Sequence, residues 1–113
     1  MDYLHGFDSK EQDRLIHQAQ FLEPYVYTGV DFKKVNRLLE VGCGVGAQSK
    51  ILLKRFPKIQ ITGVDFSSAQ LHVAAQYLKR PISDGRVHLL QQDAQRLDLV
   101  YKKYDAAFLC WFL

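Results

Sequence analysis

The sequence predicts an α/β protein with a doubly wound, mostly parallel sheet. Short apolar segments that end at a glycine or an aspartate alternate with amphipathic segments bounded by capping residues and prolines. Strands that alternate with helices in this way build β-α-β units, whose crossovers are right-handed and whose strands run parallel. One domain is expected, because 113 residues leave little room for a second.

Seven helices and strands are expected from these boundary residues. Ser9 and Gln12 form a capping-box pattern at a helix start, and Ser67 is expected to cap another helix. Pro24 and Pro81 are expected to stop the helices before them, because proline lacks the backbone N–H that a helix interior uses. The expected helices are 10–22, 47–56 and 67–79, and the expected strands are 37–41, 59–64, 87–90 and 104–112.

The composition carries no signature of a nucleic-acid or membrane protein. Hydrophobic residues make up 48% of the chain, and the net charge of +3 comes from scattered basic residues, so no nucleic-acid partner is expected. We find no signal-peptide pattern and no run of roughly 18 apolar residues. Cys43 and Cys110 have no metal-ligand spacing with a histidine, so we expect no metal site and a reducing, cytoplasmic compartment.

A glycine-rich loop follows the first expected strand. Gly42, Gly44 and Gly46 alternate there, with Cys43 inside the loop and Glu40 just before it. At this turn of a doubly wound sheet, a ligand can lie against bare backbone and against the N–H groups of a helix N-terminus. Taken alone, the loop fits a tight turn without a ligand equally well.

Two later strands end in a carboxylate at the same edge of the sheet. Asp65 follows the second strand, and its two oxygens can accept hydrogen bonds from both hydroxyls of a ribose. Asp93 follows the third strand, where a carboxylate can accept an adenine amino group while the Ala94 N–H reaches a ring nitrogen. The alternatives are a turn or capping role for Asp65 and an ordinary loop position for Asp93. The glycine loop and both acids together favour an adenosine ligand.

Four segments occur in a fixed order: Leu-Glu-Val-Gly-Cys-Gly-Val-Gly at 39–46, Gly-Val-Asp-Phe-Ser at 63–67, Gln-Asp-Ala at 92–94 and Tyr-Asp-Ala-Ala-Phe at 104–108. They resemble the ordered motifs of class I S-adenosylmethionine-dependent methyltransferases. The resemblance implies a Rossmann-like cofactor domain at 37–113 and an N-terminal helix and lid segment at 1–36. It also implies S-adenosylmethionine as the cofactor, with S-adenosylhomocysteine as its product.

The resemblance gives the adenosine part of the cofactor to residues after the second and third strands. Asp65 would hold the ribose, and Phe66 would lie against the adenine. Asp93 and Ala94 would contact the edge of the adenine.

The methionine part would lie on the glycine loop, including Cys43, with Glu40 supporting its amino group directly or through water. The resemblance places Cys110 and Trp111 near the methionine part and the acceptor, although an apolar strand end also fits a core position.

The expected chemistry needs few side chains, because the methyl group already sits on a positively charged sulfonium and the protein mainly aligns donor and acceptor. We expect no protein nucleophile. His5 is the one candidate for a general base, near Tyr3 in a segment that fits a mobile terminus better. Residues 109–112 lack the Asn/Asp-Pro-Pro-Tyr motif of enzymes that methylate amino nitrogens of bases or glutamine, so a small-molecule acceptor is expected.

Two other classes of function stay open. Gly42, Gly44 and Ala47 satisfy the looser dinucleotide fingerprint of an NAD-binding oxidoreductase, although Glu40 and Asp93 argue against it. The chain can also be a truncated, non-catalytic binding module, since about four strands are expected where the family has about seven. The last strand is apolar on both faces, so its free edge should drive self-association or recruit a complementing fragment.

Overall fold

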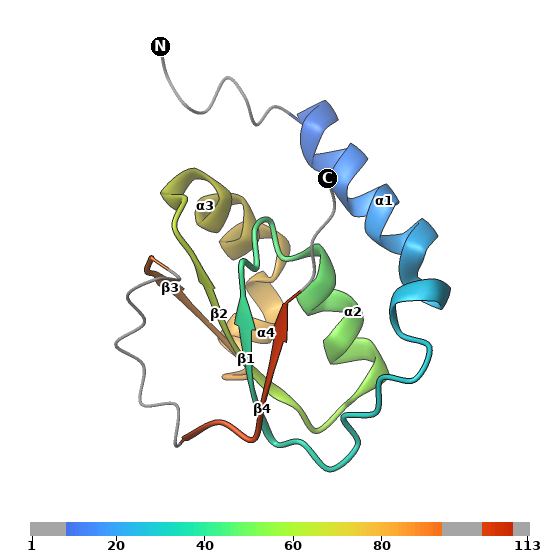
Figure 1. Ribbon diagram of the computed structural model, residues 1–113. Coiled ribbons are helices and arrows are strands. Elements are labelled where there is room, and N and C mark those ends of the chain that lie inside the picture. Colours follow the sequence, from blue (N-terminus) through green and yellow to red (C-terminus); the bar gives the residue numbers. More distant parts are fainter. Residues whose placement is uncertain (1–8, 94–102, 110–113) are drawn as a thin grey trace.

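A computed structural model of the protein describes residues 9–93 and 103–109 (Figure 1). At its centre is a four-stranded parallel sheet with the order β3-β2-β1-β4. The predicted α/β class with a parallel sheet is therefore confirmed. The strands are β1 Arg37–Val41, β2 Gln60–Asp65, β3 Val87–Gln91 and β4 Ala106–Leu109.

The strands lie close to the predicted segments. β1 has the predicted bounds, and β2 and β3 each extend one residue further than predicted at the carboxyl end. β4 begins at Ala106 and not at residue 104. The chain bends at Asp105, whose carboxylate accepts hydrogen bonds from the N–H groups of Asn36 and Arg37, both at 2.9 Å. The predicted end of this strand, at 112, lies outside the described residues.

Four helices are described. Ser67 caps one of them as predicted, since its hydroxyl oxygen accepts the N–H of Gln70 at 3.1 Å. None of the helices in the described part of the chain has the length and apolarity needed to cross a membrane. The helices are α1 Ser9–Val26, α2 Ala47–Arg55, α3 Ser68–Tyr77 and α4 Lys79–Ser83.

Two prolines do not stop helices as predicted. α1 continues past Pro24, because this residue removes only its own N–H, and helical bonding resumes where the Tyr27 N–H donates to the Glu23 carbonyl at 3.1 Å. Pro81 lies in the first turn of α4, where the backbone N–H groups have no partner within the helix. The short helix α4 thus occupies the place of the predicted helix stop.

The described helices pack against one face of the sheet (Figure 1). Leu38, Ile61 and Val87 point to this face from three neighbouring strands, and each is at most 1% exposed. They form one core cluster with Leu52 of α2. Burying each such side chain contributes about 1.5–3 kcal/mol, so this layer fixes the strand ends that carry the loops.

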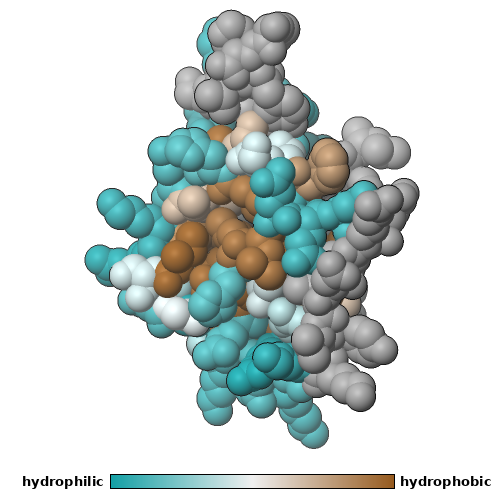
Figure 2. Space-filling view, turned by 90° about the vertical axis from the view of Figure 1, so that its left-hand side faces the viewer, coloured by the Kyte–Doolittle hydropathy of each residue, from teal (hydrophilic) through white to brown (hydrophobic). Residues whose placement is uncertain are grey.

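The opposite face is less covered at its outer strands. The strand register aligns Leu90, Val64, Val41 and Leu109 in one row across the sheet. Val64 in the middle is 1% exposed, whereas Leu90 of β3 is 38% and Leu109 of β4 is 52% exposed. Figure 2 looks onto the β3 side of the molecule and shows apolar side chains gathered at its centre with polar ones around them.

β4 is apolar on both faces, as predicted. Phe108 points to the helices, where its ring stacks on Tyr27 with the centroids 5.7 Å apart and meets the Phe32 ring edge-on. Ala107 and Leu109 alternate to the other face and are exposed. β1 pairs with one edge of β4, and no strand within 9–93 or 103–109 pairs with its other edge.

Candidate functional site

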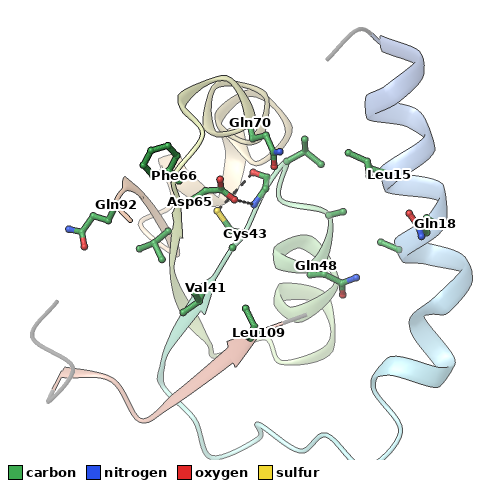
Figure 3. Close-up of a pocket in the computed structure, with 16 residues that line it drawn as sticks. Leu15, Gln18, Val41, Cys43, Gln48, Asp65, Phe66, Gln70, Gln92 and Leu109 are labelled. Carbon is green, nitrogen blue, oxygen red and sulfur yellow. Dashed lines mark hydrogen bonds between the residues drawn. The ribbon is translucent and has the colours of Figure 1, made fainter. Parts of the chain in front are cut away.

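A cavity of about 460 Å³ opens where the strand order reverses. β2 and β3 lie on one side of β1 and β4 lies on the other, which leaves a crevice beyond the carboxyl ends of β1 and β4. Figure 3 shows the cavity reaching from α1 across the loop after β1 to the end of β3. Its walls are Leu15, Gln18, Ala19, Val41, Gly42, Cys43, Gly44, Val45, Ala47, Gln48, Val64, Asp65, Phe66, Gln70, Gln92 and Leu109.

The loop after β1 is tied to β2 through its backbone. The N–H groups of Gly42 and Cys43 both donate to the Val64 carbonyl, at 2.9 and 3.0 Å. Gly42 has a φ of 72° and Gly44 a φ of 56°, in the left-handed region that glycine adopts without strain. The loop can therefore turn sharply and still present its backbone to the cavity.

Gly44 and Gly46 of this loop have different neighbours. A Cβ on Gly46 would lie 2.7 Å from Leu78 Cδ1, so this glycine lets α2 begin close to the end of α3. A Cβ on Gly44 would lie 2.8 Å from Gln70 Oε1, and both residues line the cavity. Gly44 thus borders the cavity, whereas Gly46 packs behind it.

Asp65 joins the loop to the end of β2. Its Oδ2 accepts the N–H of Gly44 at 2.8 Å (Figure 3). Its Oδ1 accepts the N–H of Ser67 at 2.9 Å. The bond to Ser67 is the turn role that the sequence left open. Each carboxylate oxygen has a second lone pair, so Asp65 can also accept hydrogen bonds from a ligand in the cavity.

The β2 end of the cavity also carries an aromatic side chain. Phe66 is 72% exposed and lines the cavity beside Asp65, so its ring is available for stacking. Gln92 follows β3, and its N–H donates to the Asp65 carbonyl at 3.0 Å. Asp93 comes next and is half-buried.

Glu40 lies behind the loop and not on the cavity wall. It is 2% exposed, and one carboxylate oxygen accepts the hydroxyl of Ser49 on α2. The pKa of Glu40 is raised to about 7, chiefly by burial and also by the negative charge of Asp65, while the hydrogen bond from Ser49 lowers it. Glu40 therefore titrates near neutral pH, inside the packing that supports the loop.

Cys43 is a packed residue of the loop. It is 5% exposed, and a Cβ on Gly63 would lie 3.0 Å from its Sγ, so the glycine in β2 leaves room for the thiol. Burial, and then the charges of Glu40 and Asp65, raise the pKa of the Cys43 thiol. A raised pKa favours the neutral thiol, which is the less nucleophilic form.

The sequence-predicted residues divide into three groups. Those on the cavity wall are Gly42, Cys43, Gly44, Asp65 and Phe66; those behind or beside it are Glu40, Gly46 and Asp93. Tyr3, His5, Ala94, Cys110 and Trp111 lie outside the described residues.

Sequence reasoning missed the wall that α1 and α2 form. Leu15, Gln18 and Ala19 of α1 and Gln48 of α2 line the cavity beside the loop. Gln48 follows the glycine motif closely, so its position in the first turn of the helix was a usable signal. The α1 residues have no such signal in the sequence, because their contact with the loop depends on how α1 packs against α2.

A parallel sheet with a glycine loop, a carboxylate after the next strand and a cavity at the point where the strand order reverses defines a Rossmann-like ligand-binding domain. The chain matches a family of proteins described as "Methyltransferase domain" over residues 38–113. It is 36% identical over 74 residues to a malonyl-[acyl-carrier protein] O-methyltransferase of Priestia megaterium, covering 66% of this chain and 25% of the relative.

Solved structures show the same similarity. The S-adenosylmethionine-dependent methyltransferase SibL matches with a TM-score of 0.70 and 24% identity, over 88% of this chain and 29% of that one. The Haemonchus contortus phosphoethanolamine N-methyltransferase 2, solved with phosphomonomethylethanolamine and S-adenosylhomocysteine, matches with a TM-score of 0.65 and 25% identity, over 82% of this chain and 20% of that one.

The chain belongs to the class I S-adenosylmethionine-dependent methyltransferases. It spans about a quarter of the length of the Priestia relative.

Proposed function

We propose that this chain carries the cofactor-binding part of an S-adenosylmethionine-dependent methyltransferase with a small-molecule acceptor. The observation that carries the proposal is the hydrogen bond of 2.8 Å between the Gly44 N–H and the Asp65 carboxylate. It joins the two most specific sequence motifs at one wall of a cavity of about 460 Å³. A volume of that order is in the range of small-molecule and cofactor sites, roughly 300–1,000 Å³.

The residues on the cavity wall fit an adenosine ligand. Asp65 keeps lone pairs for the two ribose hydroxyls, and the exposed ring of Phe66 can stack on the adenine. At the loop, Gly42 and Gly44 leave the backbone open to the methionine part, and Glu40 supports this loop from behind. Asp93, with the predicted contacts of Ala94 and Cys110, would complete the site.

The cofactor supplies a methyl group on a sulfonium, which is a ready leaving group. The protein then has to orient the acceptor in line with that bond and exclude water, which proximity and orientation can achieve without a covalent intermediate. No cysteine nucleophile is needed, in keeping with the buried thiol of Cys43. His5 remains the candidate for a general base.

The small-molecule acceptor is supported by the names of two relatives, which act on a carrier-linked malonyl group and on phosphoethanolamine. We also propose the division into a lid segment at 1–36 and a cofactor domain at 37–113, a cytoplasmic location, and self-association through β4.

Calorimetry on the purified protein separates the proposal from the oxidoreductase alternative. We expect S-adenosylhomocysteine to bind in the micromolar range or tighter and NAD to show no heat of binding at the same concentrations. Binding of NAD alone would overturn the proposal. Tight binding of S-adenosylhomocysteine without methyl transfer to any acceptor in a panel of small carboxylic acids, phosphoamines and thioesters would favour the non-catalytic binding module.

A further inference from the structure

Gln48 is a buried amide at the α1 end of the cavity. It lies in the first turn of α2, is 7% exposed and lines the cavity. Figure 3 shows its side chain projecting from α2 toward α1, away from the Asp65 end. Its Nε2 has no hydrogen-bond partner within the described residues.

Tyr27 fixes the orientation of this amide. The Tyr27 hydroxyl donates to Gln48 Oε1 at 2.5 Å, so the oxygen of the amide is used and the nitrogen faces away from Tyr27. Tyr27 itself is 3% exposed, stacks on Phe108 and lies under the Arg55 guanidinium, 5.0 Å from the ring centroid. The donor of Gln48 is therefore held in place before any ligand binds.

A buried amide donor that makes no hydrogen bond is unfavourable, because it has lost its bonds to water without replacing them. A fixed donor of this kind is explained if a ligand oxygen accepts it. Two further features favour such an oxygen at this place. The N-cap Gly46 makes no side-chain cap hydrogen bond, and Ala47 and Gln48 of the first turn line the cavity, so the positive end of α2 lies beside it. Leu15 and Ala19 make the wall opposite apolar, which strengthens a hydrogen bond there.

We propose, building on the proposed function, that Gln48 binds a carboxylate oxygen of the ligand through Nε2 and that Tyr27 is the positioning residue for this contact. The carboxylate can belong to the amino-acid part of the cofactor or to the acceptor. Asp65 is the only charged side chain on the described cavity wall, so recognition at the α1 end relies on neutral donors.

The test compares S-adenosylhomocysteine with 5′-methylthioadenosine, which shares the adenosine part but lacks the amino-acid carboxylate. Gln48→Glu keeps an acceptor for Tyr27 and removes the donor, and Gln48→Met keeps the length without any donor. At pH 8, we expect both variants to lose at least tenfold in affinity for S-adenosylhomocysteine and less than twofold for 5′-methylthioadenosine. Tyr27→Phe should show the same selectivity with a smaller loss.

The matched control is Gln60→Glu, the same change at an exposed position at the amino end of β2, and it should change neither affinity. If the Gln48 variants bind both adenosine ligands normally, acetate titrated into the S-adenosylhomocysteine complex tests the acceptor as the source. A shift of the Gln48 side-chain amide signal in the NMR spectrum, absent in Gln48→Glu, would then support the contact.

Three results would overturn the inference. In the first, both adenosine ligands weaken equally in the Gln48 variants, which would make the residue structural. In the second, neither affinity changes and acetate leaves the amide signal unmoved. In the third, the wild-type protein binds neither ligand, which would overturn the proposed function as well.

Discussion

The two ends of the cavity are built in different ways. At the β2 end, Asp65 is the last residue of the strand and Phe66 follows it, and one hydrogen bond from Gly44 joins Asp65 to the loop. At the α1 end, the wall comes from α1, from the first turn of α2 and from Tyr27, which fixes Gln48 from beyond the end of α1. One end is a set of local motifs at strand ends, whereas the other exists only once α1 packs on α2.

This difference predicts two kinds of response to substitution. Changes at the β2 end should weaken every ligand that contains adenosine. Changes at the α1 end should weaken only ligands that carry a group beyond the ribose. The predictions below test this division, beginning with the largest expected effect.

Gly44→Val should abolish binding of both S-adenosylhomocysteine and 5′-methylthioadenosine in calorimetry. The new side chain would stand on the cavity wall, with its Cβ 2.8 Å from Gln70 Oε1, and the φ of 56° disfavours a β-branched residue. Gly29→Val is the matched control, because Gly29 has a φ of 82° and nothing within 4 Å of a Cβ. It should lose comparable stability, roughly 1–2 kcal/mol, and keep its affinity. Normal binding by a folded Gly44→Val protein would reduce the loop to a turn.

Asp65→Ala should weaken both adenosine ligands by a few kcal/mol, because each hydrogen bond to a charged group contributes about 1.5–3 kcal/mol. Asp65→Asn should lose less. Asp31→Ala is the control for the turn role, since Asp31 accepts the N–H of Lys33 two residues on, as Asp65 accepts that of Ser67. If Asp65→Ala and Asp31→Ala both change stability and neither changes affinity, Asp65 is a turn residue only.

Glu40 supports the loop between the two ends, and its protonation should appear in the stability of the protein. The folded protein holds this proton up to about pH 7, while the unfolded chain releases it near the ordinary value of 4.5. The folded state thus binds more protons in this window, so the free energy of unfolding should fall as the pH rises from 4.5 to about 7. At 1.36 kcal/mol per pKa unit, the fall attributable to Glu40 is roughly 3 kcal/mol.

Urea denaturation at several pH values measures this contribution as the difference between the wild type and Glu40→Gln. Ser49→Ala should move the fall to higher pH, because the Ser49 hydroxyl lowers the pKa of Glu40. Parallel pH profiles of the wild type and Glu40→Gln would show that Glu40 keeps an ordinary pKa.

The difference between the two ends also explains what the sequence could predict. β1 has the bounds expected from its apolar run, and Ser67 caps α3 as expected, because both signals are local. α1 was predicted to end before Pro24, yet it runs two residues past the proline, because only the N–H of Pro24 itself is lost from the helix. Likewise, nothing within the sequence near Gln48 indicates that Tyr27, 21 residues away, occupies one side of its amide.

The same limit applies to the glycine motif. Its spacing predicted three equivalent glycines against a ligand, but Gly46 faces Leu78 and only Gly42 and Gly44 border the cavity. Which glycine borders the cavity and which packs on a helix depends on distant side chains, such as Leu78, which lies 32 positions after Gly46 in the sequence.

The smallest expected effect concerns β4, which contributes Leu109 to the cavity wall. Its outer edge has no partner strand within the described residues, and Ala107 and Leu109 are exposed beside that edge, a combination that favours pairing with a second copy. We expect the protein to self-associate in sedimentation at micromolar concentration. Ala107→Lys should weaken the association by roughly 1 kcal/mol, the scale of one cross-strand interaction. Phe108 is unsuitable for this test, because its ring packs on Tyr27 and a charge there would unfold the core. Ala75→Lys, the same change at an exposed position of α3, should leave the association unchanged. A compact wild-type monomer that binds S-adenosylhomocysteine would show that the edge of β4 recruits no second copy.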